Sequence, residues 1–281
     1  MRLRIAIPAV LSLLMMLCGF SALLAFQARF KEYAGEEDNP TAVPKDAFEQ
    51  TEWTFARLRY PSGRYTGYDG ERGSWPTDFP KADRQFLQGV RRLTRIHTRS
   101  TEQVIDLIGD PDEVYNWPWV YAVEVGHWDL TDEQCKLLRE YFLRGGFLMV
   151  DDFWGPGAEQ WNLFRQTMQR VFPGRPITDI APGDSVMHVL YDIEEKDRTF
   201  IPGSRHLRIG PGGGVVVQQP PGTTPAWRAI ADDRNRMIVA VNYNTDIGDA
   251  WEYADSPEYP ERMTALAYRY GINYVIYAMT H

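Results

Sequence analysis

The chain has 281 residues, a formal net charge of -8 and a hydrophobic fraction of 44%. This length suits one large α/β domain with short appendages. The acidic balance leaves no excess of basic side chains for contacts with phosphates, so we expect no nucleic-acid partner. The two cysteines, Cys18 and Cys135, cannot build a disulfide framework or a cysteine-based zinc site.

The N-terminal segment, residues 1–28, predicts a membrane location. Ile5–Phe26 carries no charge and is long enough to cross the ~30 Å hydrocarbon core of a bilayer. Arg2 and Arg4 precede it, which favours a domain outside the cytoplasm, in the periplasm or at the cell surface. Because a good small-residue cleavage site is missing near Ala25–Ala28, we predict a retained transmembrane anchor. The alternative is a cleaved signal segment and a secreted domain.

The soluble part begins with a polar segment. Residues 29–50 lack an apolar period, so we expect a linker before a domain that spans 51–281. Within the domain, alternating apolar residues predict a strand over 52–60. A loop over 65–80 is rich in glycine, proline and aromatic residues, and loops of this length in a compact domain are usually functional. Apolar residues at helical spacing then predict a helix over 81–96 that packs one face on a sheet.

The centre of the domain shows a strand followed by a helix. Residues 101–108 form a short amphipathic piece, and the apolar residues of 119–128 predict the next strand and its exit. Thr131 followed three residues later by Gln134 has the pattern of a helix capping box. We therefore expect a helix to begin at this point and to run along the sheet.

A glycine stop, an apolar run and two carboxylates follow that helix. Gly145 and Gly146 end it, and Phe147–Val150 predicts a buried parallel strand. The order strand, helix, strand gives a right-handed crossover and hence a parallel sheet. Because ligands of open α/β sheets bind at the carboxyl ends of parallel strands, Asp151 and Asp152 stand where a site is expected.

The second half of the domain continues the α/β pattern. An irregular, β-rich insertion is expected around 200–242, and its glycine run is no nucleotide loop because a strand and two prolines follow it. Together the elements predict a flavodoxin-like, mostly parallel sheet with helices on both faces. The further elements that we predict are a helix over 158–171, strands over 177–180, 215–218, 227–231 and 236–241, a polar loop over 242–252, a helix over 257–270 and a last strand over 274–278.

Several segments carry a resemblance to a known family. Phe55–Tyr60, Trp75–Asp83 and Gly145–Asp152 are similar to the bacterial domain-of-unknown-function family numbered 4159, and the similarity extends from Thr51 to the C-terminus. That family resembles class I glutamine amidotransferase-like folds, so the resemblance implies such a fold for 51–281. It implies no activity, because the family has no established one.

The resemblance also shows what the chain lacks. Working amidotransferases place a nucleophilic cysteine on a glycine-flanked turn directly after a strand. The strand exit that corresponds to it here, Val150–Phe153, contains no cysteine, and Cys135 lies within a predicted helix. We therefore expect no glutaminase chemistry by a thiolate.

The carboxylates after the central strand allow two interpretations. In one, Asp151 and Asp152 cap the next helix or pair with an arginine; in the other, they line a ligand pocket. Arg57 and Arg59 project on the same side of the first strand and form a possible fork for a carboxylate. The full set of ligand-binding candidates is Arg57, Arg59, Trp75, Asp78, Asp151, Asp152, Asn242, Asn244, Trp251 and Glu252.

Metal binding has weak support in the sequence. His127 with Asp151 and Asp152 is one candidate set, but it lacks the short spacing of strong metal motifs. The alternation of Asn242, Asn244, Asp246 and Asp249 resembles an oxygen-rich calcium loop, yet the required glycine and glutamate do not fall in register. We predict no metal and no cofactor.

These observations lead to three alternatives. We favour a membrane-anchored, extracytoplasmic module that binds an unknown small molecule or an envelope protein without catalysis. The alternative is a hydrolase that uses Asp151 or Asp152 as general base or metal ligand. In the third, the domain is a scaffold whose loops at the strand ends are only structural.

Overall fold

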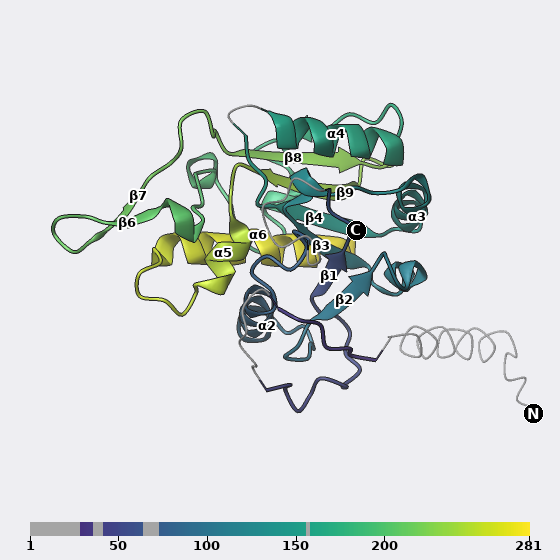
Figure 1. Cartoon of the computed structure of the whole chain (residues 1–281), viewed down its shortest axis with the longest axis horizontal. Coiled ribbons are helices and arrows are strands. Elements are labelled where there is room, and N and C mark those ends of the chain that lie inside the picture. Colours follow the sequence, from purple (N-terminus) through teal and green to yellow (C-terminus); the bar gives the residue numbers. More distant parts are fainter. Residues whose placement is uncertain (1–28, 36–41, 64–72, 156–157) are drawn as a thin grey trace, which may run out of the picture.

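The computed structural model describes residues 29–35, 42–63, 73–155 and 158–281 (Figure 1). The predicted anchor and the loop residues Tyr65 and Tyr68 lie outside these ranges. Within them, none of the helices combines the length and the apolar character that crossing a membrane requires. The expected linker has neither helix nor strand where it is described, but it contacts the domain: the Asp46 carboxylate accepts hydrogen bonds from the backbone N–H and the hydroxyl of Ser100.

The described residues form a seven-stranded sheet with the order β2-β1-β3-β4-β9-β8-β5. The pairs from β2 to β9 are parallel, whereas β8 pairs antiparallel with both β9 and β5. The predicted mostly parallel α/β sheet is therefore confirmed. Its strands are β1 (Ala56–Arg59), β2 (Gln103–Asp106), β3 (Trp119–Val123), β4 (Phe147–Asp151), β5 (Thr178–Asp179), β8 (Ala226–Ala231) and β9 (Met237–Tyr243).

Helices cover both faces of this sheet (Figure 1). Side chains alternate along a strand, so Phe147 and Met149 of β4 face one apolar core while Leu148 and Val150 face the other. The first core contains residues of α2 (Lys81–Leu93), α5 (Ile247–Glu252) and α6 (Glu261–Thr280), and the second contains residues of α3 (Asp132–Leu143) and α4 (Glu159–Val171). Short 3-10 helices lie at Pro111–Asn116, Val125–His127, Ser185–Met187, Glu195–Asp197 and Ser204–His206.

The predicted capping box forms at the start of α3. Thr131 accepts a hydrogen bond from the backbone of Gln134, and the Gln134 side chain accepts one from the backbone of Thr131. Two predicted elements are wrong. The amphipathic piece over 101–108 contains strand β2 at the edge of the sheet, and the polar loop over 242–252 contains the end of β9 and the helix α5.

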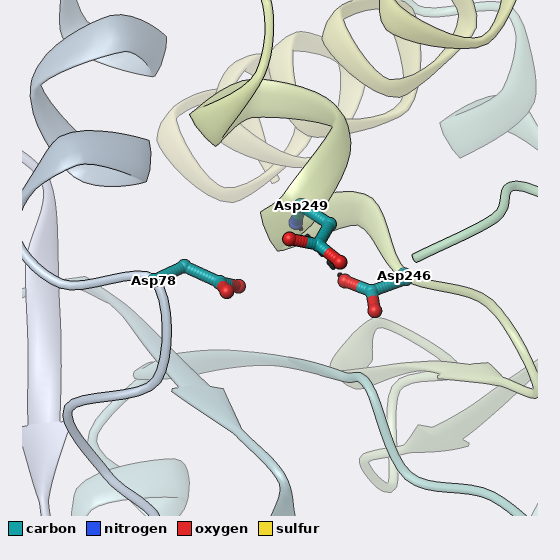
Figure 2. A group of neighbouring side chains, drawn as sticks. All are labelled: Asp78, Asp246 and Asp249. Carbon is teal, nitrogen blue, oxygen red and sulfur yellow. Dashed lines mark hydrogen bonds between the residues drawn. The ribbon is translucent and has the colours of Figure 1, made fainter. Parts of the chain in front are cut away.

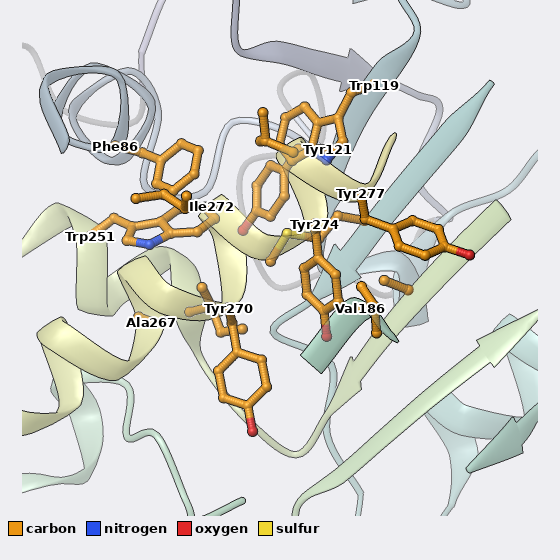
Figure 3. Close-up of a cluster of buried hydrophobic side chains, with 14 of the residues drawn as sticks. Phe86, Trp119, Tyr121, Val186, Trp251, Ala267, Tyr270, Ile272, Tyr274 and Tyr277 are labelled. Atoms are coloured by element: carbon orange, nitrogen blue, oxygen red, sulfur yellow. The ribbon is translucent and has the colours of Figure 1, made fainter. Parts of the chain in front are cut away.

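The end of the chain is also different from the prediction of a helix followed by a strand, because α6 is one continuous helix. Gly271 lies within this helix and permits close packing: a Cβ atom there would lie 2.6 Å from ring atoms of both Phe86 and Trp251. Tyr270, Tyr274 and Tyr277 recur at helical spacing and point into the first core (Figure 3).

A small hairpin stands apart from the main sheet. Its strands are β6 (Leu207–Ile209) and β7 (Val215–Val217), which pair antiparallel and project at the left of Figure 1. The expected β-rich insertion is thus present; β7 was predicted and β6 was not. Directly before β6, the segment Gly203–His206 returns to the carboxyl end of the parallel strands, where it contacts the candidate site.

Candidate acidic site at the carboxyl edge of the sheet

Asp151, the last residue of β4, is fully buried and holds the start of α5. One carboxylate oxygen accepts a hydrogen bond from the Tyr121 hydroxyl at 2.5 Å. The other accepts from the backbone N–H groups of Ile247 and Gly248 at 2.6 and 3.1 Å. Burial raises the pKa of Asp151 to about 7, although these hydrogen bonds oppose the shift. Both oxygens are therefore engaged in holding the structure together.

Asp152 connects the strand end to the segment before β6. Its φ of 47° lies in the left-handed region, which aspartate tolerates better than most residues. The carboxylate accepts hydrogen bonds from the Trp154 indole and, at 2.9 Å, from the Arg205 guanidinium. The same Arg205 nitrogen lies 3.9 Å from Asp246 Oδ2.

The turn between β9 and α5 supplies two further buried carboxylates. Asp246 is the N-cap of α5, and its Oδ1 accepts a hydrogen bond from the Asp249 backbone N–H at 3.0 Å. Asp249 Oδ2 accepts from the backbone N–H of Ser204 at 2.6 Å. Asp246 is fully buried, and its Oδ2 has no hydrogen-bond partner among the described residues.

Asp78 completes the group from a distant part of the sequence. It precedes α2 with a left-handed φ of 62°, and its carboxylate points from that loop towards Asp246 and Asp249 (Figure 2). One oxygen of each of the three residues lies within 4.8 Å of the others, and all three residues are buried. We call Asp78, Asp246 and Asp249 the acidic site.

Mutual repulsion and burial dominate the electrostatics of this site. Burial is the largest cause that raises the pKa of Asp78 and Asp246 well above the ordinary aspartate value, and it also raises the pKa of Asp249. Neighbouring carboxylates, including Asp152, raise all three further, while Arg205 lowers the pKa of Asp246 and Asp249. An excess of buried negative charge of this kind must be neutralised by protons or by a bound cation.

Two glycines bring the backbone close to these oxygens. A Cβ atom on Gly203 would lie 2.4 Å from Asp246 Oδ2 and 2.9 Å from Asp249 Oδ2. A Cβ atom on Gly248 would lie 2.3 Å from Asp78 Oδ2. A side chain at either position would press on these carboxylates unless they moved, so the two glycines allow the close approach of backbone and carboxylate.

The predicted arginine fork does not face Asp151 or Asp152. Arg57 is fully buried and pairs with Asp83, to which its Nε and Nη2 donate at 2.8 and 2.5 Å. Its Nη1 donates to the backbone carbonyls of Trp75 and Thr77 at 3.1 and 2.9 Å, which fixes the loop that carries Asp78. Arg59 turns away and donates to Asp106 at 2.6 Å.

Most of the other candidates support the structure. Asn242 donates to the Val150 carbonyl and accepts from Tyr274, and Asn244 donates to the Thr224 carbonyl and accepts from the Gly155 N–H. Glu252 differs, because it is buried and its charge raises the pKa of Asp78. The tryptophans Trp75 and Trp251 are buried and pack on Phe79 and Phe86, and His127 contacts Gln160.

Sequence reasoning thus selected Asp78 but did not select Asp246, Asp249 or Arg205 as site residues. Asp246 and Asp249 were noticed as part of an oxygen-rich alternation, and this was the available signal. Asp246 is the N-cap of α5 and Asp249 is the third residue of that helix, so their spacing is also explained by helix capping. The carboxylates that converge are therefore different from His127, Asp151 and Asp152, the set that had weak support as a metal site in the sequence.

Comparison with known sequences places the chain in a family. The model of the family described as Domain of unknown function (DUF4159) matches residues 54–279, which is most of the chain, and the chain belongs to this family. No curated protein sequence matches it.

Proposed function

We propose that this member of the DUF4159 family is a membrane-anchored, extracytoplasmic module that binds a cationic ligand at the acidic site. The observation that carries the proposal is the convergence of the buried Asp78, Asp246 and Asp249 at the carboxyl ends of the parallel strands. Ligands of open α/β sheets bind at this edge. A buried group of like charges is costly unless something positive or a proton neutralises it, which supports a positively charged ligand.

We further propose that the fold is related to class I glutamine amidotransferases without sharing their chemistry. The parallel sheet with its site at the carboxyl edge supports the relation. Cys135 lies on α3 and packs in the second core, and burial raises the pKa of its thiol, which disfavours the reactive thiolate.

Binding is better supported than hydrolysis by Asp151 or Asp152. A general base needs a free oxygen within reach of the proton that it removes. Both oxygens of Asp151 accept hydrogen bonds from the protein, and Asp152 is paired with Arg205. These contacts suit residues that position α5 and the segment before β6.

The ligand proposal is tested by cation-induced stabilisation of the full chain. Thermal unfolding is measured with divalent metal ions and, separately, with primary amines and polyamines. We expect at least one of these cations to raise the Tm, because a ligand that binds only the folded state stabilises it. The increase is lost in Asp246→Asn and kept in Asp112→Asn, a control at an exposed aspartate outside the acidic site. Absence of stabilisation by every cation would overturn the proposal.

The location is tested separately. The segment Ile5–Phe26 carries no charge and is long enough to span a bilayer, which supports a retained anchor. The arginines before it support a domain outside the cytoplasm. We expect the full chain in the membrane fraction, with an extracytoplasmic domain that added protease reaches from that side. A soluble mature form whose sequenced N-terminus lies near Arg29 would show instead that the segment is a cleaved signal.

A further inference from the structure

The geometry points to a hard divalent metal ion, of the Mg²⁺, Mn²⁺ or Ca²⁺ class, as the ligand of Asp78, Asp246 and Asp249. This inference rests on the proposed function and narrows it from any cation to a metal ion. Four features of the site support it. They are the spacing of the three carboxylates, an oxygen of Asp246 that accepts no hydrogen bond, the chemical type of the ligand atoms, and the close approach of two glycines.

The spacing of the carboxylates fits a shared ion. Oxygen ligands of Mg²⁺ and Ca²⁺ stand about 2.0–2.6 Å from the metal, so two of them lie at most about 4–5 Å apart. One oxygen from each of the three aspartates lies within 4.8 Å of the others. This separation is close to that of oxygens around one ion, so small rotations of the side chains would let a single ion contact all three, although Asp78 and Asp246 lie far apart in the sequence.

Asp246 Oδ2 is the atom that most requires such a partner. The residue is fully buried, and this oxygen accepts no hydrogen bond from the described residues. Asp246 Oδ2 and Asp249 Oδ2 lie beside the same point, the position that a Cβ atom of Gly203 would take. Arg205 approaches Asp246 Oδ2 only to 3.9 Å, because its hydrogen bond goes to Asp152. A buried carboxyl oxygen without a hydrogen bond is rare in folded proteins, and a metal ion would satisfy it.

The donor type selects the class of metal. All three groups are carboxylates, which suit the hard ions Mg²⁺, Ca²⁺ and Mn²⁺, whereas zinc and copper sites favour imidazole and thiolate ligands. His206 lies in the Gly203–His206 segment that contacts the site, and its Nδ1 already accepts a hydrogen bond from the Gly203 N–H. The site therefore offers oxygen ligands to the ion.

The close approach of two glycines to the carboxylates favours an ion over an organic amine. The backbone of Gly203 approaches Asp246 and Asp249 so closely that even a methyl group there would collide with their oxygens. Gly248 approaches Asp78 in the same way. A primary amine carries a carbon chain that needs room on at least one side, whereas a metal ion needs only the space between the oxygens and water ligands.

Direct titration of the full chain tests the inference. The protein is solubilised in detergent, freed of metals with a chelator, and titrated with Mn²⁺, whose free-ion electron paramagnetic resonance signal falls on binding. Mg²⁺ and Ca²⁺ are titrated by calorimetry. We expect one ion per chain in the unmutated protein and in Asp112→Asn. In Asp246→Asn we expect affinity to fall by at least about tenfold, since even the outer partners of metal ligands change affinity by about 10- to 100-fold.

Two further variants keep the test decisive. Asp246→Asn retains a residue that caps helices well, so its fold is expected to persist and is checked by circular dichroism. If it fails to fold, Asp78→Asn serves in its place, because Asp78 lies outside α5. Arg205→Gln removes a positive charge near Asp246 Oδ2, so it is expected to bind Mn²⁺ more tightly; weaker binding would contradict an ion at this position.

The outcomes separate the metal inference from the broader proposal. Saturable metal binding that Asp246→Asn weakens supports both. Stabilisation by amines alone, with no saturable binding of Mn²⁺, Mg²⁺ or Ca²⁺, overturns the inference of a metal ion. The proposal of a cationic ligand would still stand. Metal binding of equal strength in Asp246→Asn and the unmutated protein overturns this site as the location of the ion.

Discussion

The loop Trp75–Pro80 joins two buried charged groups that are built differently. On one side, Arg57 and Asp83 form a pair in which each charge meets its opposite and both side chains are fully buried. On the other, the carboxylates of the acidic site face one another, and the nearby Arg205 is directed mainly to Asp152. In the first group each charge has an opposite partner, whereas the second group has an excess of negative charge.

This difference separates support from function. The Arg57 pair also binds the carbonyls of Trp75 and Thr77, so it fixes the loop that delivers Asp78 to the acidic site. Buried charges that are fully paired hold elements in place, whereas buried charges that repel one another at a sheet edge favour a site for a ligand. Mutations at the two groups should consequently have opposite effects on stability.

Arg57→Met is expected to have the largest effect. It leaves the Asp83 carboxylate buried without its partner and removes a donor from the loop carbonyls, which should cost about 3–5 kcal/mol of the free energy of unfolding. Denaturant unfolding measures the change. The matched control is the double variant Arg57→Met with Asp83→Leu, which should recover part of the loss because no charge then remains unpaired. If the single variant lost less than about 1 kcal/mol of the free energy of unfolding, Arg57 would not be the partner on which the buried Asp83 depends.

Asp151→Asn tests how stability depends on pH at the carboxyl edge of the sheet. The folded pKa of Asp151 is raised to about 7, so its contribution to stability is present below its unfolded pKa and is lost as pH rises through about 7. Such a shift corresponds to at most about 4 kcal/mol. Asparagine can still accept from the Ile247 N–H and cannot titrate. We therefore expect the variant to gain stability relative to the unmutated protein between acidic and mildly alkaline pH. The measurement is the free energy of unfolding of both proteins as a function of pH. A constant difference between them over this pH range would show that Asp151 does not titrate there.

Asp246→Asn should act in the direction opposite to Arg57→Met. Asparagine keeps the cap on α5 and removes one of the mutually repelling groups. With metals removed by a chelator, we expect the free energy of unfolding to rise, because burial and the neighbouring carboxylates disfavour the charged form of Asp246. The exposed control Asp112→Asn should change little. Destabilisation of the chelated Asp246→Asn protein would mean that the carboxylates do not repel one another there.

The fold was predictable to the extent that its signals are local. Buried apolar runs, the capping box at Thr131 and the stop at Gly145 each act within one or two turns of chain, and they gave the parallel sheet and the location of Asp151 at its edge. The predicted break of the last helix after residue 270 was wrong: Gly271 lies inside α6, where it allows contact with Phe86 and Trp251.

The acidic site was predictable only in part, for the same reason. Asp78 and Asp246 meet because α2 and α5 both begin at the same edge of the sheet, and no pattern within either segment records that meeting. Arg57 and Arg59 looked like ligands because arginines at a strand end often are. Their partners, Asp83 and Asp106, lie on other elements, and only the fold reveals that both arginines are already paired.

Arg59→Gln gives the smallest effect and sharpens the contrast with Arg57. The Arg59 side chain is 29% exposed, so solvent screens its pair with Asp106. Burial alone would raise the pKa of Asp106, but the N–H groups of Gly109 and Ile108, together with Arg59, hold it below the usual aspartate value. The two N–H donors remain in the variant, each at 3.0 Å. We therefore expect a loss below about 1 kcal/mol in denaturant unfolding and unchanged cation binding. A loss as large as that of Arg57→Met would show that exposure does not distinguish the two arginines.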